Sequence, residues 1–246
     1  MKSGLLQQYG LSSAHVFDSV HLGALNSSGH VNFYSRKVFL GGLPPDIDEH
    51  EIKAVFWKFG SFEVYWPGKD DNPNYMFPPK GFAFLLFLAE DSVRRLVQAC
   101  IHGNDGGLYY LLSSPSVKNK VIQVKPWKLS DAVTIVHESL FTKKQFAVFV
   151  GGVPRALTSG ELARQALCVF GNVSYSEIFL DYKIGYPKGS GVIYFSNFKS
   201  FVSAIRTKFF EVVVGDSVKY VSRTKAVFQK MVVTGENPIS SLYPEL

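Results

Sequence analysis

The sequence predicts an α+β protein built from two tandem βαββαβ units, each a four-stranded antiparallel sheet with two helices on one face. The first indication is a repeat, in which VFLGGLP at 38–44 returns as VFVGGVP at 148–154. A second pair follows in the same order, PPKGFAFLLF at 78–87 and YPKGSGVIYF at 186–195. The two offsets, 110 and 108 residues, agree closely enough to indicate a duplicated domain.

Each copy continues from its first strand into a helix. Asp48 and Glu51 form a capping signal in the first copy, and Thr158 with Glu161 does so in the second. A glycine follows each helical stretch and predicts its end. Apolar residues recur at helical spacing in both copies: Ile52, Val55, Phe56 and Phe59, then Leu162, Ala166, Val169 and Phe170.

The remaining elements complete the split βαβ order of a ferredoxin-like unit. They are a second strand, the strand that contains the Lys-Gly pair, a second helix and a last strand. We place them at 61–66, 80–87, 90–101 and 121–125 in the first copy, and at 173–180, 186–195, 197–209 and 219–226 in the second.

The domain boundaries follow from these elements. We expect a first module at 36–128, with an insertion at 104–119 in which 108–112 forms an extra short strand, and a second module at 145–229. Residues 1–35 are rich in Ser, Gly, Asn and His, a composition typical of disorder. Residues 129–144 are expected to be a linker, and residues 230–246 a tail.

The composition predicts a soluble intracellular protein, and its net charge of +6 favours an anionic partner. The chain has no secretory signal and no apolar run of the roughly 20 residues that a membrane helix needs. It also lacks metal-ligand spacings and phosphate-binding glycine loops. Cys100 and Cys168 fall in predicted helices, which indicates core packing rather than a disulfide or a zinc site. We therefore expect no cofactor, no metal site and no catalytic residue.

The strand at 80–87 is apolar on both of its faces, whereas a strand with one wet face normally alternates. If alternate residues from Ala83 to Phe87 face the helices, Phe82 and Phe84 lie on the open face. Phe39, in the neighbouring strand, joins them there. The alternative is that these rings are core residues. It is disfavoured because the alternate residues on the other face of the strand already fill the core. Rings on an open sheet can stack nucleic-acid bases.

Two motifs carry a family resemblance. VFLGGL fits the hexamer and KGFAFLLF the octamer of the RNA recognition motif, and only Leu85 departs from the octamer pattern. The resemblance implies an RNA-binding sheet, on which Lys80 would meet a phosphate. Gln123 and Lys125 lie on the same face of the last strand, the face that should contact the RNA. A side-chain amide such as that of Gln123 can read base edges there.

Two features around this last strand have two interpretations each. Lys118, Lys120, Lys125 and Lys128 form either a phosphate track towards the second sheet or an ordinary solvated edge. Trp127 either stacks a base at the edge of the sheet or packs under the linker. We include Trp127 among the expected RNA contacts.

The likeness extends beyond the domain family, from residue 36 to about residue 228. RKVFLGGLPPDIDEHEI, WPGKDDNPNYMFPPKGFAFLLF, LSSPSVKNKVIQVKPWKLSD and FVGGVPRALTSGELA resemble the tandem RNA-binding region of the cytoplasmic polyadenylation element-binding proteins. The resemblance implies a monomer that binds single-stranded, uridine-rich elements of mRNA 3′ untranslated regions. It further implies control of polyadenylation and translation in the cytoplasm, with nuclear shuttling and with translation or polyadenylation factors as partners.

The ends of the chain depart from this family. The family usually continues beyond its second module into a cysteine- and histidine-rich zinc-binding segment, whereas KMVVTGENPISSLYPEL contains neither residue. We therefore expect that segment, and the long regulatory region that normally precedes the modules, to be truncated or lost.

The second copy has fewer rings at the motif positions. In KGSGVIYF, Ser190 and Val192 occupy the two positions where the first copy has phenylalanine. Because side chains alternate between the two faces of a strand, Phe149 and Tyr194 should lie on the open face. Lys188 could contact a phosphate there. We expect a smaller RNA surface there. The alternative is that Tyr194 packs against the linker or the first module.

The sequence is also compatible with functions other than RNA-dependent translational control. The second module could bind a protein partner, since degenerate RNA recognition motifs can bind peptides, or the chain could act in splicing or other mRNA processing. An enzyme on the same fold is conceivable, because fold does not determine chemistry. No nucleophile–base set or metal cluster recurs in the repeat, so we expect a binding protein.

Overall fold

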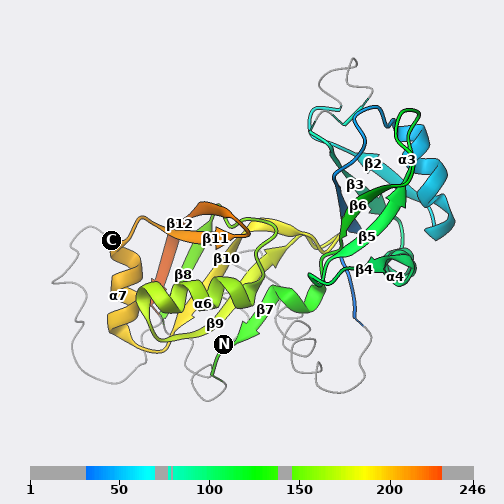
Figure 1. Ribbon diagram of the computed structural model, residues 1–246. Helices are drawn as coiled ribbons and strands as arrows, with labels where there is room; N and C mark the ends of the chain where they lie inside the picture. Colours follow the sequence, from blue (N-terminus) through cyan, green and yellow to red (C-terminus); the bar gives the residue numbers. More distant parts are fainter. Residues whose placement is uncertain (1–31, 70–76, 79, 138–145, 229–246) are drawn as a thin grey trace, which may run out of the picture.

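The chain forms two modules, each a six-stranded antiparallel sheet with two α-helices, drawn as two lobes in the computed structural model (Figure 1). The structure describes residues 32–69, 77–78, 80–137 and 146–228. The strand orders are β2-β3-β1-β6-β5-β4 in the first sheet and β11-β12-β8-β10-β9-β7 in the second. The predicted tandem α+β architecture is confirmed.

The first module follows the predicted element order with two added strands. Its elements are β1 (Lys37–Gly41), α3 (Glu49–Phe56), the 3₁₀ turn η1 (Trp57–Phe59), β2 (Phe62–Tyr65), β3 (Phe82–Phe87), α4 (Glu90–Ala99), β4 (Ile101–His102), β5 (Leu108–Leu112) and β6 (Lys120–Lys125). The insertion supplies β5, as predicted. The extra strand β4 begins where the sequence predicts the last turn of the second helix.

The second module has the same core order with an added strand at each edge. Its elements are η2 (Leu129–Ala132), β7 (Val133–Ile135), β8 (Phe146–Gly151), α6 (Ser159–Phe170), β9 (Val173–Leu180), β10 (Pro187–Phe195), α7 (Phe198–Arg206), β11 (Phe209–Val214) and β12 (Ser217–Phe228). Strand β11 begins at Phe209, the last residue that the sequence assigns to the second helix. Both sheets are therefore wider than the four strands expected.

Residues 129–135 are not a linker, so the prediction for 129–144 is wrong in this part. Val133–Ile135 forms β7, which pairs with β9 and extends the second sheet. The hydroxyl groups of Thr134 and Ser159 lie 2.6 Å apart and join β7 to the start of α6. Val133 is buried, so adding this strand removes apolar surface from water. Residues 138–145 lie outside the described part of the chain.

Both first helices begin with the capping boxes that the sequence predicts. In α3 the Asp48 carboxylate accepts the Glu51 N–H at 2.8 Å, and the Glu51 carboxylate accepts the Asp48 N–H at 3.0 Å. In α6 Thr158 and Glu161 make the same reciprocal pair at 3.2 and 2.8 Å. Each box satisfies two backbone donors that the helix itself leaves unpaired.

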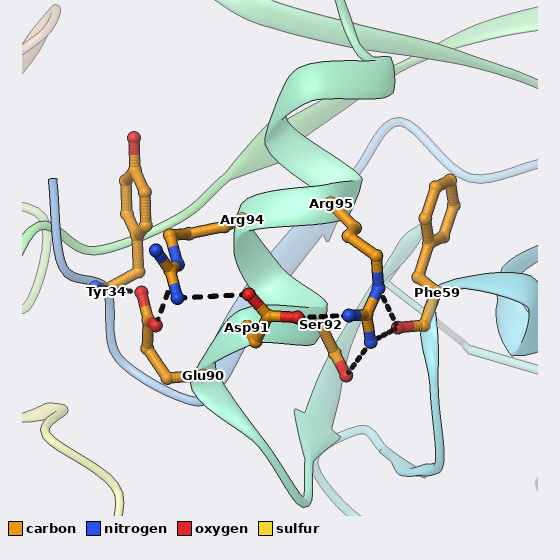
Figure 2. A network of polar contacts seen from close by, with 7 residues as sticks. All are labelled: Tyr34, Phe59, Glu90, Asp91, Ser92, Arg94 and Arg95. Atoms are coloured by element: carbon orange, nitrogen blue, oxygen red, sulfur yellow. Dashed lines mark hydrogen bonds and ion pairs between the residues drawn. The ribbon is translucent and has the colours of Figure 1, made fainter. Parts of the chain in front are cut away.

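The helix α4 is held at its N-terminal end by polar contacts (Figure 2). The Arg95 guanidinium donates two hydrogen bonds, of 2.8 and 3.2 Å, to the carbonyl of Phe59, and it pairs with Asp91. The Glu90 carboxylate accepts the backbone N–H of Tyr34 at 3.0 Å. These contacts join the helix to the end of η1 and to the segment that precedes β1.

Each core lies between the helices and one face of its sheet. The strand β3 alternates half-buried and buried side chains along its whole length, and β1 buries alternate residues in the same way. The first core therefore combines these two strands with residues of α3 and α4: Val38, Leu40, Ile52, Phe56, Ala83, Leu85, Phe87, Val93 and Leu96. The face of the sheet opposite α3 and α4 is not part of this core.

Residues 33–36 tie the two modules together, so the disorder expected for 1–35 is wrong at this end. The Ser35 N–H donates to the carbonyl of Trp127 at 2.8 Å, and the Ser35 hydroxyl donates to the carbonyl of Ile184 at 2.8 Å. The Arg36 N–H donates to the same Ile184 carbonyl at 2.9 Å. Tyr34 is buried beside them. Residues 1–31 lie outside the described part.

The two cysteines differ from each other. Cys100 is buried, as predicted, and its burial raises the pKa of its thiol to about 11. Cys168 is exposed on α6, so the prediction of core packing is wrong for this residue. Within the described residues, no group of three or more His, Cys, Asp or Glu could hold a metal ion. Nor does that part contain a helix long and apolar enough to cross a membrane.

Candidate nucleic-acid interface

Three phenylalanines lie together on the open face of the first sheet, as their parity predicts. The ring centroid of Phe39 is 5.5 Å from that of Phe82 and 5.6 Å from that of Phe84, and the latter two are 5.9 Å apart. All three side chains are half-buried, whereas their sequence neighbours Ala83 and Leu85 are fully buried on the helix side. Half-exposed rings on a sheet without helices on that side can receive bases by stacking.

Strand register brings these rings together. Phe39 is directly opposite Phe84, and Gly41 is opposite Phe82 in the β1–β3 pair. A Cβ atom added to Gly41 would lie 2.6 Å from the Phe39 ring, so the absence of a side chain leaves room for that ring. The glycine of the hexamer motif is thus needed to seat an aromatic ring of the same strand.

Two residues of the neighbouring strand β6 flank the rings. Lys125 is opposite Phe39 in the β1–β6 pair, and Gln123 is opposite Gly41. Lys125 is exposed and Gln123 is half-buried, while the intervening Val124 is buried on the helix side. The structure therefore places both residues on the ring-bearing face, as predicted. Lys80 is exposed just before β3.

Two residues of the first module complete this face and were missed by sequence reasoning. Tyr65 of β2 is 42% exposed and its ring lies 6.4 Å from that of Phe84, its partner in the strand pair. The Lys37 ammonium lies 4.3 Å from the centroid of the Phe84 ring and 5.2 Å from that of Tyr65. Parity could have found both, since Tyr65 follows buried Val64 and Lys37 is two residues before Phe39.

A third missed residue comes from the second module. Tyr186, in the turn between β9 and β10, places its ring 6.2 Å from Phe84 in an edge-on arrangement and 5.3 Å from the Lys37 ammonium. Partial burial, and then the positive charge of Arg155, lower the pKa of Lys37. No sequence pattern predicts this contact, because it depends on how the modules dock.

The structure contradicts a stacking role for Trp127. Its side chain is 7% exposed and belongs to the buried apolar cluster of the second module. Of the two interpretations, packing is therefore the one observed. Of the nearby lysines, Lys120 donates to the carbonyl of Leu43 at 3.2 Å and Lys118 to that of Ser114 at 3.4 Å.

The open face of the second sheet is largely filled. Val192 and Tyr175 are buried there, 3% and 1% exposed, in a cluster against which Phe149 and Tyr194 pack. Ala132 and Val133, from η2 and β7, belong to the same cluster. The centre of this face is thus closed with apolar side chains.

The three residues predicted to bind RNA in the second module have different surroundings. The Tyr194 ring lies 5.5 Å from that of Tyr175, and burial raises the pKa of its hydroxyl to about 12. The Phe149 ring lies 6.2 Å from that of Phe179. Lys188 is exposed at the start of β10. Phe149 and Tyr194 are half-buried, as are the three rings of the first sheet, but both pack against the buried cluster of this face, which favours the packing alternative for Tyr194.

Comparison with known proteins finds a matching family model and several similar proteins. The family model described as RNA recognition motif matches residues 35–126, which include the ring-bearing sheet. Translational regulator orb2 of Drosophila melanogaster is 46% identical over 188 residues, and Cytoplasmic polyadenylation element-binding protein 1 of Caenorhabditis briggsae is 38% identical over 201 residues. Over the matched part, the chain is similar to these cytoplasmic polyadenylation element-binding proteins. Its relative in Caenorhabditis remanei, with the same protein name, is 37% identical over 203 residues.

The family likeness concerns one part of the relatives. Each match covers 76% of this chain but only 26% of the Drosophila protein and 34% of each of the two nematode proteins. The chain therefore spans about a quarter to a third of the length of these cytoplasmic polyadenylation element-binding relatives. Within this chain, the match to the RNA recognition motif model falls on the first module.

Proposed function

We propose that this chain binds single-stranded RNA in a sequence-specific way through the open face of its first module. The observation that carries the proposal is the cluster of Phe39, Phe82 and Phe84, half-exposed on the sheet face opposite α3 and α4. Half-exposed rings gain little as core residues, whereas base stacking on an aromatic ring contributes about 1–3 kcal/mol per base. Lys80 and Lys125 supply positive charge for the phosphates, and Gln123 can read a base edge.

The proposed target is a uridine-rich element in the 3′ untranslated region of an mRNA. The names of the relatives, translational regulator and cytoplasmic polyadenylation element-binding protein, support a role in cytoplasmic polyadenylation and translation. On this proposal the chain is a monomeric binding protein that acts in the cytoplasm and delivers translation or polyadenylation factors to the message. We propose no catalytic role for it.

Fluorescence anisotropy tests the RNA specificity directly. Oligouridine and oligocytidine of equal length should be titrated with the purified chain at two salt concentrations, with duplex DNA as a third ligand. We expect tighter binding to oligouridine and a salt dependence of about 0.7 in log–log slope per phosphate contacted. Equal affinity for the two oligonucleotides, or tight binding to the duplex, would contradict the proposal.

A binding-and-sequencing selection on the same protein would then define the motif. The chain should enrich uridine-rich single strands from a random pool. Enrichment of structured or uridine-poor sequences would refute the proposed target, even where RNA binding itself is found.

A further inference from the structure

The junction between the modules carries a group of cations and rings that the first sheet alone does not explain. Lys37 of β1 lies within 4.3–5.3 Å of three ring centroids, two from the first module and one, Tyr186, from the second. Arg155, in the loop between β8 and α6, donates from its Nε to the carbonyl of Pro187, the residue after Tyr186. Three separate segments thus converge at one place.

The positive charges of Lys37 and Arg155 at this junction form no ion pair with an acidic side chain within the part of the chain that the structure describes. Burial lowers the pKa of Lys37 most, and the like charge of Arg155 lowers it further. Holding two like charges near each other, one of them half-buried, costs stability unless an anion joins them.

The junction is rigidly built. The Ser35 hydroxyl and the Arg36 N–H both donate to the carbonyl of Ile184. The Arg36 guanidinium also donates to the carbonyls of Leu88 and Lys183, at 3.0 and 2.8 Å. These bonds fix the β9–β10 turn against the strand that bears Lys37. The ring of Tyr186 is therefore already placed at the end of the aromatic row on the first sheet before any ligand arrives.

We propose that Lys37, Arg155 and Tyr186 form a nucleotide position between the modules, where an RNA phosphate meets both cations and the attached base stacks on Tyr186. This position rests on the proposed RNA binding and extends it. A strand lying on Phe39, Phe82 and Phe84 would pass directly onto it, because Phe84 contacts Tyr186. An anionic strand supplies the charge that the junction lacks, and aromatic rings accept bases of any sequence.

The test compares the salt dependence of RNA binding among variants of the full chain. The probes are a long oligouridine that reaches both modules and a short one confined to the first sheet. Lys37→Met and Arg155→Met remove one charge each while keeping an apolar stem. Lys199→Met is the matched control, because Lys199 is an exposed lysine on α7. Tyr186→Ala is compared with Tyr186→Phe, which keeps the ring.

We expect each of the two junction charge variants to reduce the log–log salt slope for the long probe by about 0.7, the value for one phosphate contact on a single strand. Lys199→Met should leave that slope unchanged. Tyr186→Ala should weaken the long probe by about 5- to 150-fold, and Tyr186→Phe should not weaken it. The short probe should respond much less to all of these changes.

Thermal unfolding separates ligand binding from a structural role. Lys37→Met should change the unfolding temperature little, because removal of a half-buried charge and its repulsion with Arg155 offsets the loss of the contacts between the ammonium and the three rings. An unchanged salt slope for both charge variants, or an equal fall with Lys199→Met, overturns the inter-module position. Failure of the unchanged protein to bind either probe would instead overturn the proposed RNA binding itself.

Discussion

The substitution Phe82→Ala tests whether the ring-bearing face binds RNA. Phe82 contacts two other rings, at centroid distances of 5.5 and 5.9 Å, and its side chain is half-buried. Each aromatic pair contributes about 0.5–1.5 kcal/mol beyond area burial, so the change should cost about 1–3 kcal/mol of folding free energy. Loss of one base stack should weaken RNA binding by about 1–3 kcal/mol, or about 5- to 150-fold.

Phe87→Ala is the matched control, since it is the same substitution in the same strand on the other face. The Phe87 side chain is fully buried in the core of the first module. Removal of a buried phenylalanine should cost about 3–5 kcal/mol of folding free energy. The molecules that remain folded should bind RNA with nearly unchanged affinity, because the ring does not reach the open face.

Both quantities can be measured on the same protein samples. Urea denaturation gives the free energy of unfolding, and fluorescence anisotropy with labelled oligouridine gives the dissociation constant at a concentration where the variant is folded. We expect Phe82→Ala to lose RNA affinity as well as some stability, whereas Phe87→Ala should lose more stability and leave the affinity of the folded molecules nearly unchanged. This reasoning would be refuted if Phe82→Ala bound RNA as tightly as the unchanged protein, or if the two variants lost affinity equally.

Three further predictions concern charge and thiols. Lys80→Ala and Lys125→Ala should each lower the log–log salt slope of RNA binding by about 0.7, and a slope unchanged by either would remove that lysine from the phosphate path. RNA affinity should fall as the pH rises towards the ordinary lysine range, because burial and a nearby guanidinium lower the pKa of Lys37 and its ammonium loses its proton earlier. Lys37→Arg should remove this fall on the same RNA, and an equal fall in the variant would show that another group titrates. In a thiol-reagent assay the exposed Cys168 should react at once, whereas the buried Cys100 should react only after denaturation; rapid reaction of both would contradict the burial of Cys100.

Most of the first module could be predicted from its sequence, for local reasons. A strand alternates its side chains with a period of two, so Phe82 and Phe84 must share a face once Ala83 and Leu85 are assigned to the core. Capping boxes act over three residues, so Asp48 and Glu51 could be recognised without a structure. The repeat then carried the same element order to the second module.

In the second module, the sequence does not determine which side chains on the open face are covered. Parity correctly assigns Tyr194 and Phe149 to one face, but it cannot say whether that face is empty. Residues of η2 and β7, in the stretch predicted to be a linker, belong to the cluster against which both side chains pack. Whether a side chain is covered depends on segments distant in the chain, and parity contains no information about them.

The sequence by itself therefore determined the duplicated βαββαβ order, the helix starts and the ring-bearing face, because each depends on residues a few positions apart. Only the tertiary structure decided that Trp127 is buried and that Tyr186 meets Lys37 beside the row of rings. That meeting joins residues about 150 positions apart across two modules. It depends on how the two folded surfaces dock, through hydrogen bonds from Ser35 and Arg36 to the carbonyls of Lys183 and Ile184, which leave no periodic pattern in the chain.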